Sequence, residues 1–117
     1  MEISLIVPFH RGKNYLRDCL ESIAVQDGVT FETILVLDHV EEEILDLLEE
    51  FEEKVSLKVL ELEEERGTAA ARNLGLQHAE GKYIYFLDAD DYLLSGTIFA
   101  LYQKAEQSGS DVVCGVV

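Results

Sequence analysis

Two patterns of apolar residues alternate along the chain. Short apolar runs typical of buried strands occur at residues 3–8, 31–38, 55–62, 82–87 and 111–117. Amphipathic stretches with helical spacing occur at residues 13–26, 41–53, 68–79 and 95–108. Strands that alternate with helices predict an α/β fold, a Rossmann-like three-layer α-β-α sandwich with a mainly parallel sheet and right-handed crossovers.

The local sequence also predicts where elements begin and end. Thr68 and Ser95 are candidate N-caps of the last two helices, because a hydroxyl can accept a hydrogen bond from the first helical N–H groups. Gly81 is expected to stop the helix before it. The run at 55–62 alternates and predicts an edge strand, whereas the run at 82–87 predicts a buried strand.

Polar residues follow three of the predicted strands directly. His10 follows the first strand, Asp38 ends the second, and Asp88, Asp90 and Asp91 follow the fourth. With the first strand central, these positions meet at the carboxyl edge of the sheet, where such folds bind ligands. Clustered carboxylates suit Mg²⁺ or Mn²⁺. The alternative is a solvated turn with a helix N-cap at Asp90 or Asp91, and Asp38 could equally be a turn residue.

Two arginines lie near the start of the predicted helix 68–79. Arg66 precedes Gly67 and Thr68, and Arg72 lies one turn into the helix. A helix N-terminus with an arginine can bind an anion. The alternative for Arg72 is an ion pair with a surface acid.

Composition narrows the functional classes. The chain has 117 residues, 48% of them hydrophobic, which suits one globular domain. The formal net charge of -15 argues against nucleic acid as a partner, because nucleic-acid surfaces are basic. Cys19 and Cys114 are expected to be buried thiols. Without a signal sequence or a long apolar run, we expect a cytoplasmic protein, or one peripheral to the inner face of the membrane in its full-length form.

Three segments resemble one enzyme family. Residues 7–11 (VPFHR) and 15–23 (YLRDCLESI) are similar to the opening of inverting family-2 glycosyltransferases with the GT-A fold. Residues 67–75 (GTAAARNLG) are similar to the Gly-X-X-X-Ala-Arg-Asn-X-Gly segment of that family. Residues 81–91 (GKYIYFLDADD) resemble its Gly-X-Tyr-Ile-X-Phe-Leu-Asp-X-Asp-Asp signature. The resemblance covers nearly the whole chain.

The resemblance implies a nucleotide-diphosphate sugar, such as a UDP-sugar, as the donor, and an acceptor glycan or lipid-linked glycan. It implies Mg²⁺ or Mn²⁺ as the cofactor. The residues with implied roles are Asp90 as metal ligand, Asp38 at the base, Pro8 and His10 along the base pocket, Asp88 near the ribose and donor sugar, and Arg66 and Arg72 near the diphosphate.

The sequence also departs from the family pattern. Residues 37–40 (LDHV) stand where the family has Asp-Asp-Gly-Ser. The family's catalytic base and acceptor site lie after the fifth strand, so the base is expected beyond Val117. We therefore expect residues 1–117 to form the donor-binding part of a GT-A domain, truncated after the fifth strand and inactive alone. The exposed apolar strand 111–117 is expected to promote self-association.

Two alternatives remain open from the residues alone. The chain could be a non-catalytic fragment or an engineered α/β core. It could also be a receiver-like phosphoacceptor domain, because five βα units with acids at strand ends describe that class as well.

Overall fold

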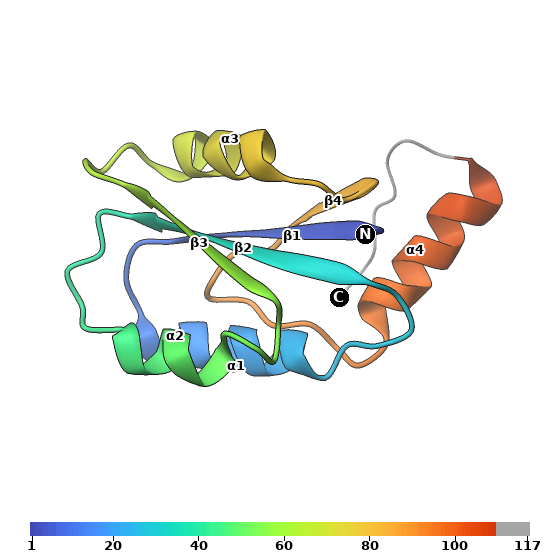
Figure 1. The fold of residues 1–117 in the computed structure, drawn as a ribbon, viewed down its shortest axis with the longest axis horizontal. Coiled ribbons are helices and arrows are strands. Elements are labelled where there is room, and N and C mark those ends of the chain that lie inside the picture. The colour runs from blue at the N-terminus through green and yellow to red at the C-terminus, as the bar shows by residue number, and fades with distance from the viewer. Residues whose placement is uncertain (110–117) are drawn as a thin grey trace.

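The computed structural model describes residues 1–109 as four strands and four helices in strict alternation (Figure 1). The elements are β1 (Ile3–Phe9), α1 (Lys13–Ala24), β2 (Phe31–Asp38), α2 (Leu45–Phe51), β3 (Leu57–Leu62), α3 (Thr68–His78), β4 (Tyr83–Phe86) and α4 (Thr97–Ser108). The predicted fifth strand, and self-association through it, fall outside the described residues.

The sheet is parallel and has the strand order β3-β2-β1-β4. Helix α3 covers one face, and α1 and α2 cover the other, so the predicted three-layer sandwich is confirmed (Figure 1). Helix α4 lies at the end of the sheet where the strands begin (Figure 1).

Receiver domains place the third strand beside the first. Here β3 lies beside β2, so the receiver-like alternative is wrong.

The core has two parts, one on each face of the sheet. The larger part packs β1 and β2 against α1 and α2, and includes Leu5, Val7, Leu20 and Leu35. The smaller part lies under α3 around Ile34 and Val36. Strands β1 and β2 are almost wholly buried, which explains their continuous apolar runs.

Strand β4 is more exposed than its sequence predicted. Ile84 and Phe86 are 38% and 41% exposed, because β4 is an edge strand among the described residues. The predicted edge strand before α3 is confirmed as β3, although it begins at Leu57 rather than at Val55. Val55 lies in the preceding turn and is buried in the core.

The boundaries of helices α2, α3 and α4 differ from the prediction. Helix α2 begins at Leu45 and not at residue 41, because Glu42 turns to α1 and Glu43 accepts a hydrogen bond from the Leu45 N–H at 2.8 Å. The N-cap residues of α3 and α4 are Gly67 and Gly96, and neither predicted hydroxyl cap makes a capping bond. Helix α3 already ends at His78, so Gly81 is not its stop.

A buried carboxylate fastens the start of β4 to the central strands. Glu32 on β2 is 4% exposed, and its Oε2 accepts hydrogen bonds from the Ser4 hydroxyl at 2.6 Å and the Glu80 N–H at 2.8 Å. Burial alone would raise the pKa of Glu32. The two hydrogen bonds, with the positive charge of Lys58, outweigh burial and lower that pKa.

We expect Glu32 to make stability depend on acid pH. A depressed folded pKa stabilises the protein above the unfolded pKa, and this stabilisation is lost as the pH falls through the folded pKa. At neutral pH, Glu32→Gln should lower the free energy of unfolding by about 1–2 kcal/mol, because the bonds to a charged acceptor weaken. Urea unfolding from about pH 7 to about pH 3 should show the difference from wild type shrinking.

Glu49→Gln is the matched control, because Glu49 is an exposed glutamate on α2. This variant should follow the wild-type curve at every pH. If the difference in the free energy of unfolding between Glu32→Gln and wild type stays constant down to the lowest pH, the link between the Glu32 pKa and stability is contradicted.

The lengths of the helices can be compared with the length that a membrane-spanning helix needs. Within residues 1–109, no helix is long and apolar enough to cross a bilayer.

Candidate functional site

The loops that follow all four strands lie along one edge of the sheet, at the left of Figure 1. This edge gathers His10 after β1, Asp38 at the end of β2, and the acidic loop, residues 88–91, after β4. The strand order puts β1 between β2 and β4, so the three loops are neighbours. The predicted meeting of these three strand ends is confirmed, and their role as a ligand site stays a prediction.

Pro8 determines where the acidic loop leaves the sheet. The ladder between β1 and β4 has Ile6 opposite Phe86 as its last pair, followed by the hydrogen bond from the Leu87 N–H to the Ile6 carbonyl at 3.0 Å. The next donor along β1 on that side would be the nitrogen of Pro8, which carries no hydrogen. Strand β4 therefore ends there, and the residues after Leu87 are free to form a loop.

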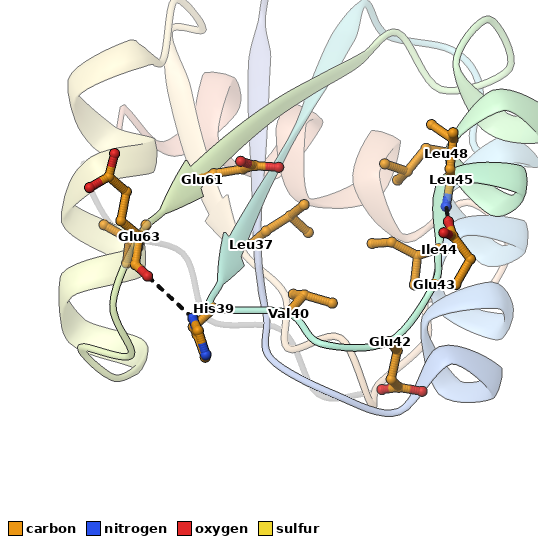
Figure 2. Close-up of a pocket in the computed structure, with 11 residues that line it drawn as sticks. Leu37, His39, Val40, Glu42, Glu43, Ile44, Leu45, Leu48, Glu61 and Glu63 are labelled. Atoms are coloured by element: carbon orange, nitrogen blue, oxygen red, sulfur yellow. Dashed lines mark hydrogen bonds between the residues drawn. The ribbon is translucent and has the colours of Figure 1, made fainter.

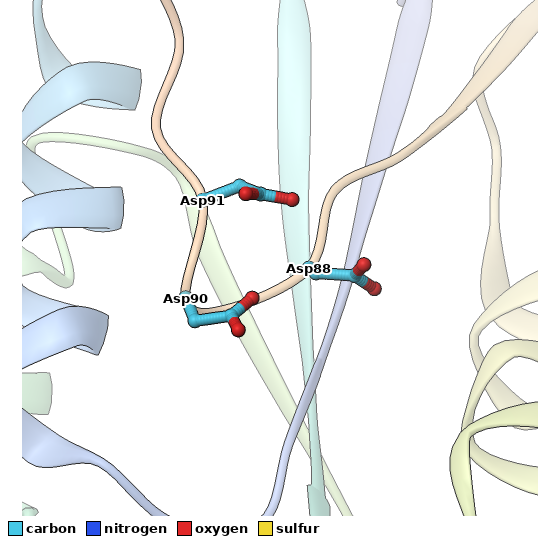
Figure 3. Close-up of side chains that lie close together, drawn as sticks. All are labelled: Asp88, Asp90 and Asp91. Carbon is cyan, nitrogen blue, oxygen red and sulfur yellow. The ribbon is translucent and has the colours of Figure 1, made fainter.

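The acidic loop brings three carboxylates together (Figure 3). Asp88, Asp90 and Asp91 each place one carboxylate oxygen within 4.8 Å of the others, and all three side chains are exposed. A turn closed by the Asp91 N–H on the Asp88 carbonyl, at 3.0 Å, holds the loop. Oxygen ligands at this spacing, open to solvent, fit Mg²⁺ or Mn²⁺, which keep water molecules among their ligands.

Arg72 engages one of these carboxylates. Its Nη2 lies 3.2 Å from Asp88 Oδ1, and its guanidinium lies over the Phe86 ring at 5.3 Å from the centroid. The ion pair with a surface acid, one of the two readings of Arg72, is therefore present. It offsets part of the charge on the acidic loop and leaves Asp90 and Asp91 as the acids of the loop without a cationic partner among the described residues.

Asp38 is buried and bound to the loop before α3. It is 5% exposed, and its two carboxylate oxygens accept hydrogen bonds from the N–H groups of Arg66 and Gly67, each at 2.9 Å. Asp38 thus satisfies backbone donors at the start of α3 from a strand 28 residues away. The Arg66 side chain itself is exposed beside the site.

The two histidines at this edge are both held by backbone carbonyls. His10 Nδ1 donates to the Asp38 carbonyl at 2.6 Å, and its Nε2 lies 3.5 Å from Glu65. His39 Nδ1 donates to the Glu63 carbonyl at 3.2 Å. His39 has a φ of 51°, in the left-handed region, at the position where the family pattern has glycine.

A cleft of about 870 Å³ joins these loops. Both His10 and Asp90 line it, so it extends from the β1 loop to the acidic loop. Its lining residues are His10, Arg11, Gly12, Tyr15, His39, Glu41, Glu42 and Asp90.

A second hollow of about 350 Å³ lies between the ends of β2 and β3 and the start of α2 (Figure 2). Its apolar lining includes Leu37, which stands where the family pattern has its first aspartate. Glu61 and Glu63 lie on its β3 side (Figure 2). The apolar side chain of Leu37 belongs to the core between the sheet and α2. This position therefore contributes no acid to the cleft of about 870 Å³.

Glu42 is a site-lining residue that sequence reasoning missed. Its carboxylate accepts hydrogen bonds from the N–H groups of Gly12 at 2.6 Å and Lys13 at 3.3 Å, at the start of α1. The sequence carries no local signal for this contact, because the partners are 30 and 29 residues apart.

Burial, with the negative charges of Asp91, Asp90 and Asp88, raises the pKa of the Cys19 thiol to about 12. The thiol therefore stays protonated, as expected for a buried cysteine. Cys114 lies outside the described residues.

A parallel sheet of this order with a cleft at its carboxyl edge is a Rossmann-like arrangement. Structural comparison narrows the class to GT-A glycosyltransferase domains: Staphylococcus aureus TarS 1-349 in complex with UDP-GlcNAc superposes with a TM-score of 0.90 at 33% identity. The match covers 95% of this chain and 33% of that chain.

The model of the family Glycosyl transferase family 2 matches residues 4–117, so the chain belongs to that family of transferases. Glycosyltransferase GlyA of Streptococcus pneumoniae serotype 4 is 35% identical over 97% of this chain, which spans 16% of GlyA. Mannosyltransferase PcManGT of Pyrobaculum calidifontis, solved with GDP-Man and Mn²⁺, matches 78% of this chain and 28% of its own at 26% identity and a TM-score of 0.71. The chain thus spans less than two-fifths of each of these relatives.

Proposed function

We propose that this chain binds the donor of a metal-dependent, inverting glycosyltransferase, a nucleoside-diphosphate sugar. The observation that carries the proposal is the acidic loop at the edge of the 870 Å³ cleft. Asp90 belongs both to the cleft lining and to the carboxylate cluster. The relatives solved with UDP-GlcNAc and with GDP-Man and Mn²⁺ support this class of ligand.

The proposed roles are those that the family resemblance implies. Of these residues, His10 and Asp90 line the cleft. Asp90 would ligate the cation, with Asp88 near the ribose and donor sugar. Asp38, His10 and Pro8 would border the base. Arg66 and Arg72 would approach the diphosphate from the α3 side. Bound Mg²⁺ or Mn²⁺ would offset the charge that develops on the leaving nucleoside diphosphate.

The reaction in question is direct displacement at the anomeric carbon. A bond forms between the acceptor hydroxyl oxygen and that carbon, on the face opposite the leaving group. The bond to the diphosphate oxygen breaks, and its electron pair leaves with the nucleoside diphosphate. The acceptor, a hydroxyl of a glycan or lipid-linked glycan, must lose its proton to a general base within about 2.6–3.2 Å.

We further propose that residues 1–117 alone bind the donor and transfer no sugar. Among the described residues, His10 and His39 are the imidazoles at this edge, and both follow β1 and β2, on the side proposed for the nucleotide. Their Nε2 atoms lie 3.5 Å from Glu65 and 3.4 Å from Glu41. We propose that the general base belongs to a part of the family's domain that this chain does not span. The rival reading is a non-catalytic fragment or engineered core with no donor affinity.

Calorimetric titration with UDP and with GDP, each with and without Mn²⁺, tests the donor proposal. We expect binding of one nucleotide that tightens when Mn²⁺ is present, because the cation links the diphosphate to Asp90. No binding under any of these conditions would contradict donor binding and favour the inactive core. Product formation from UDP-sugars with an acceptor panel would contradict the proposed inactivity of the isolated chain.

A further inference from the structure

The segment between β4 and α4 turns back along α1 after the acidic loop (Figure 1). Two side chains at the end of α1 bind it there. The Ser22 hydroxyl accepts a hydrogen bond from the Leu93 N–H at 2.9 Å and donates to the Cys19 carbonyl at 2.7 Å. Ser22, in the last turn of α1, and Gln26, two residues after its end, are here called the α1 clamp.

Gln26 supplies the more extensive half of the α1 clamp. It is 6% exposed, and its amide donates to the Leu94 carbonyl at 2.8 Å and the Ser22 carbonyl at 3.2 Å. Its amide oxygen accepts from the Ile98 N–H at 3.1 Å. Ile98 is in the first turn of α4, whose N-cap has no side-chain bond of its own, so Gln26 satisfies this helix end from a distance.

The acidic loop is therefore held at both ends. On one side, the Leu87 N–H binds the carbonyl of Ile6 in the central strand at 3.0 Å. On the other side, the α1 clamp binds Leu93, Leu94 and Ile98. Only residues 88–92 lie between these attachments. Within this short span, the neighbouring carboxylates repel one another, and repulsion favours conformations in which they separate.

We propose that Ser22 and Gln26 are positioning residues that keep Asp90 and Asp91 close enough to bind one divalent cation, and so determine the affinity for metal and nucleotide. The proposal rests on the donor-binding function proposed above. Neither residue lines the 870 Å³ cleft. Their effect is transmitted through the backbone of residues 91–94.

The energetic reason is preorganisation. When the α1 clamp is intact, the ordering of the loop is part of folding, and the cation meets carboxylates already in place. When the α1 clamp is lost, the hydrogen bonds after Asp91 are missing, and the buried Leu93 side chain and the Asp88–Asp91 turn remain to hold the loop. Binding must then supply more of the order that brings the repelling carboxylates together. Loss of residues that orient metal ligands typically weakens metal binding by about 10–100-fold.

The test compares UDP affinity with and without Mn²⁺ in Ser22→Ala, Ser22→Thr and Gln26→Leu. Ser22→Ala removes the acceptor of the Leu93 N–H, and Ser22→Thr keeps it. Gln26→Leu removes all three side-chain bonds at similar volume. We expect the gain in UDP affinity on adding Mn²⁺ to fall by about tenfold or more in Ser22→Ala and Gln26→Leu. Ser22→Thr should retain the wild-type gain.

Ile34→Val is the control for lost stability, because the change removes one methylene from the core under α3. It should lower Tm and leave the gain from Mn²⁺ unchanged. Hydrogen exchange of the Leu93 and Ile98 amides reports on the α1 clamp without any ligand. Faster exchange is expected at Leu93 in Ser22→Ala and at Ile98 in Gln26→Leu.

The outcomes separate this proposal from the one on which it rests. If wild type shows no gain from Mn²⁺, donor binding with metal is contradicted, and the positioning role with it. If wild type shows the gain and both Ser22→Ala and Gln26→Leu keep it despite faster exchange, only the positioning role is contradicted. If Gln26→Leu fails to fold, the positioning role is decided by comparing the Mn²⁺-dependent gain in UDP affinity between Ser22→Ala and Ser22→Thr.

Discussion

The Asp90→Asn variant is expected to bind UDP no more tightly with Mn²⁺ than without it. The change removes one anionic oxygen ligand while keeping the side-chain volume, and Asp90 is the acid shared by the cleft and the carboxylate cluster. Arg72 already pairs with Asp88, so Asp91 would remain as the acid of the loop without a cationic partner among the described residues. Calorimetric titration with UDP, with and without Mn²⁺, measures the effect. We expect the whole Mn²⁺-dependent gain to disappear. If the gain in the wild type is about tenfold, this loss corresponds to about 1.4 kcal/mol.

Asp18→Asn provides the control. It removes the same charge from an exposed position on α1 and should keep the wild-type gain from Mn²⁺. The fold of Asp90→Asn should be intact, and its Tm should equal or slightly exceed that of wild type, because one repelling charge is gone. An unchanged gain from Mn²⁺ in Asp90→Asn would show that Asp90 is not a metal ligand.

The Gly81→Ala variant is expected to lose about 3 kcal/mol of stability, a large share of the roughly 5–15 kcal/mol typical of a domain. A Cβ at this position would lie 2.5 Å from the Ser4 nitrogen and 2.6 Å from the Ile3 carbonyl carbon. Both atoms belong to the backbone of β1, which is held between β2 and β4 and cannot move away. The shift would also strain the hydrogen bond from the Gly81 N–H to the Ser4 hydroxyl, at 2.8 Å.

Gly75→Ala is the matched comparison. Its new Cβ would lie 2.6 Å from Cγ2 of Ile6, a side-chain atom, and alanine improves helix propensity by about 1 kcal/mol. Urea unfolding should therefore show a smaller loss for Gly75→Ala than for Gly81→Ala. Equal losses of stability in the two variants, or a Gly81→Ala variant as stable as wild type, would show that the backbone of β1 can move to make room for a Cβ at position 81.

Strand β1 determines where the acidic loop begins, although the acids of the loop follow β4. Pro8 ends the β4 ladder from the neighbouring strand, and Ile6 holds the last bond before the loop. The resemblance assigned Pro8 only to the base pocket. Its effect on the β4 ladder depends on its register with β4, which the sequence does not contain.

The order of elements and the chemistry of the strand ends could be predicted from the sequence, because both depend on local patterns. The buried runs of β1 and β2 need no partner to be identified, since strands covered on both faces are apolar throughout. The acids of the acidic loop follow such a run directly, so the carboxyl edge was the expected place for a site. The family segments extended this to specific residues, and their roles at the site remain predictions.

The ends of the helices were decided by the tertiary structure. Thr68 and Ser95 have the right side chains for local caps, yet α3 begins beside Asp38 and α4 beside Gln26. Helix α1 likewise begins beside Glu42. In each case a residue from a distant segment satisfies the free N–H groups, and only packing brings it within reach. Local sequence therefore determined which elements form and which residues follow the strands, and the packing of β2 and α1 against the loops decided where the helices begin and how the acidic loop is held.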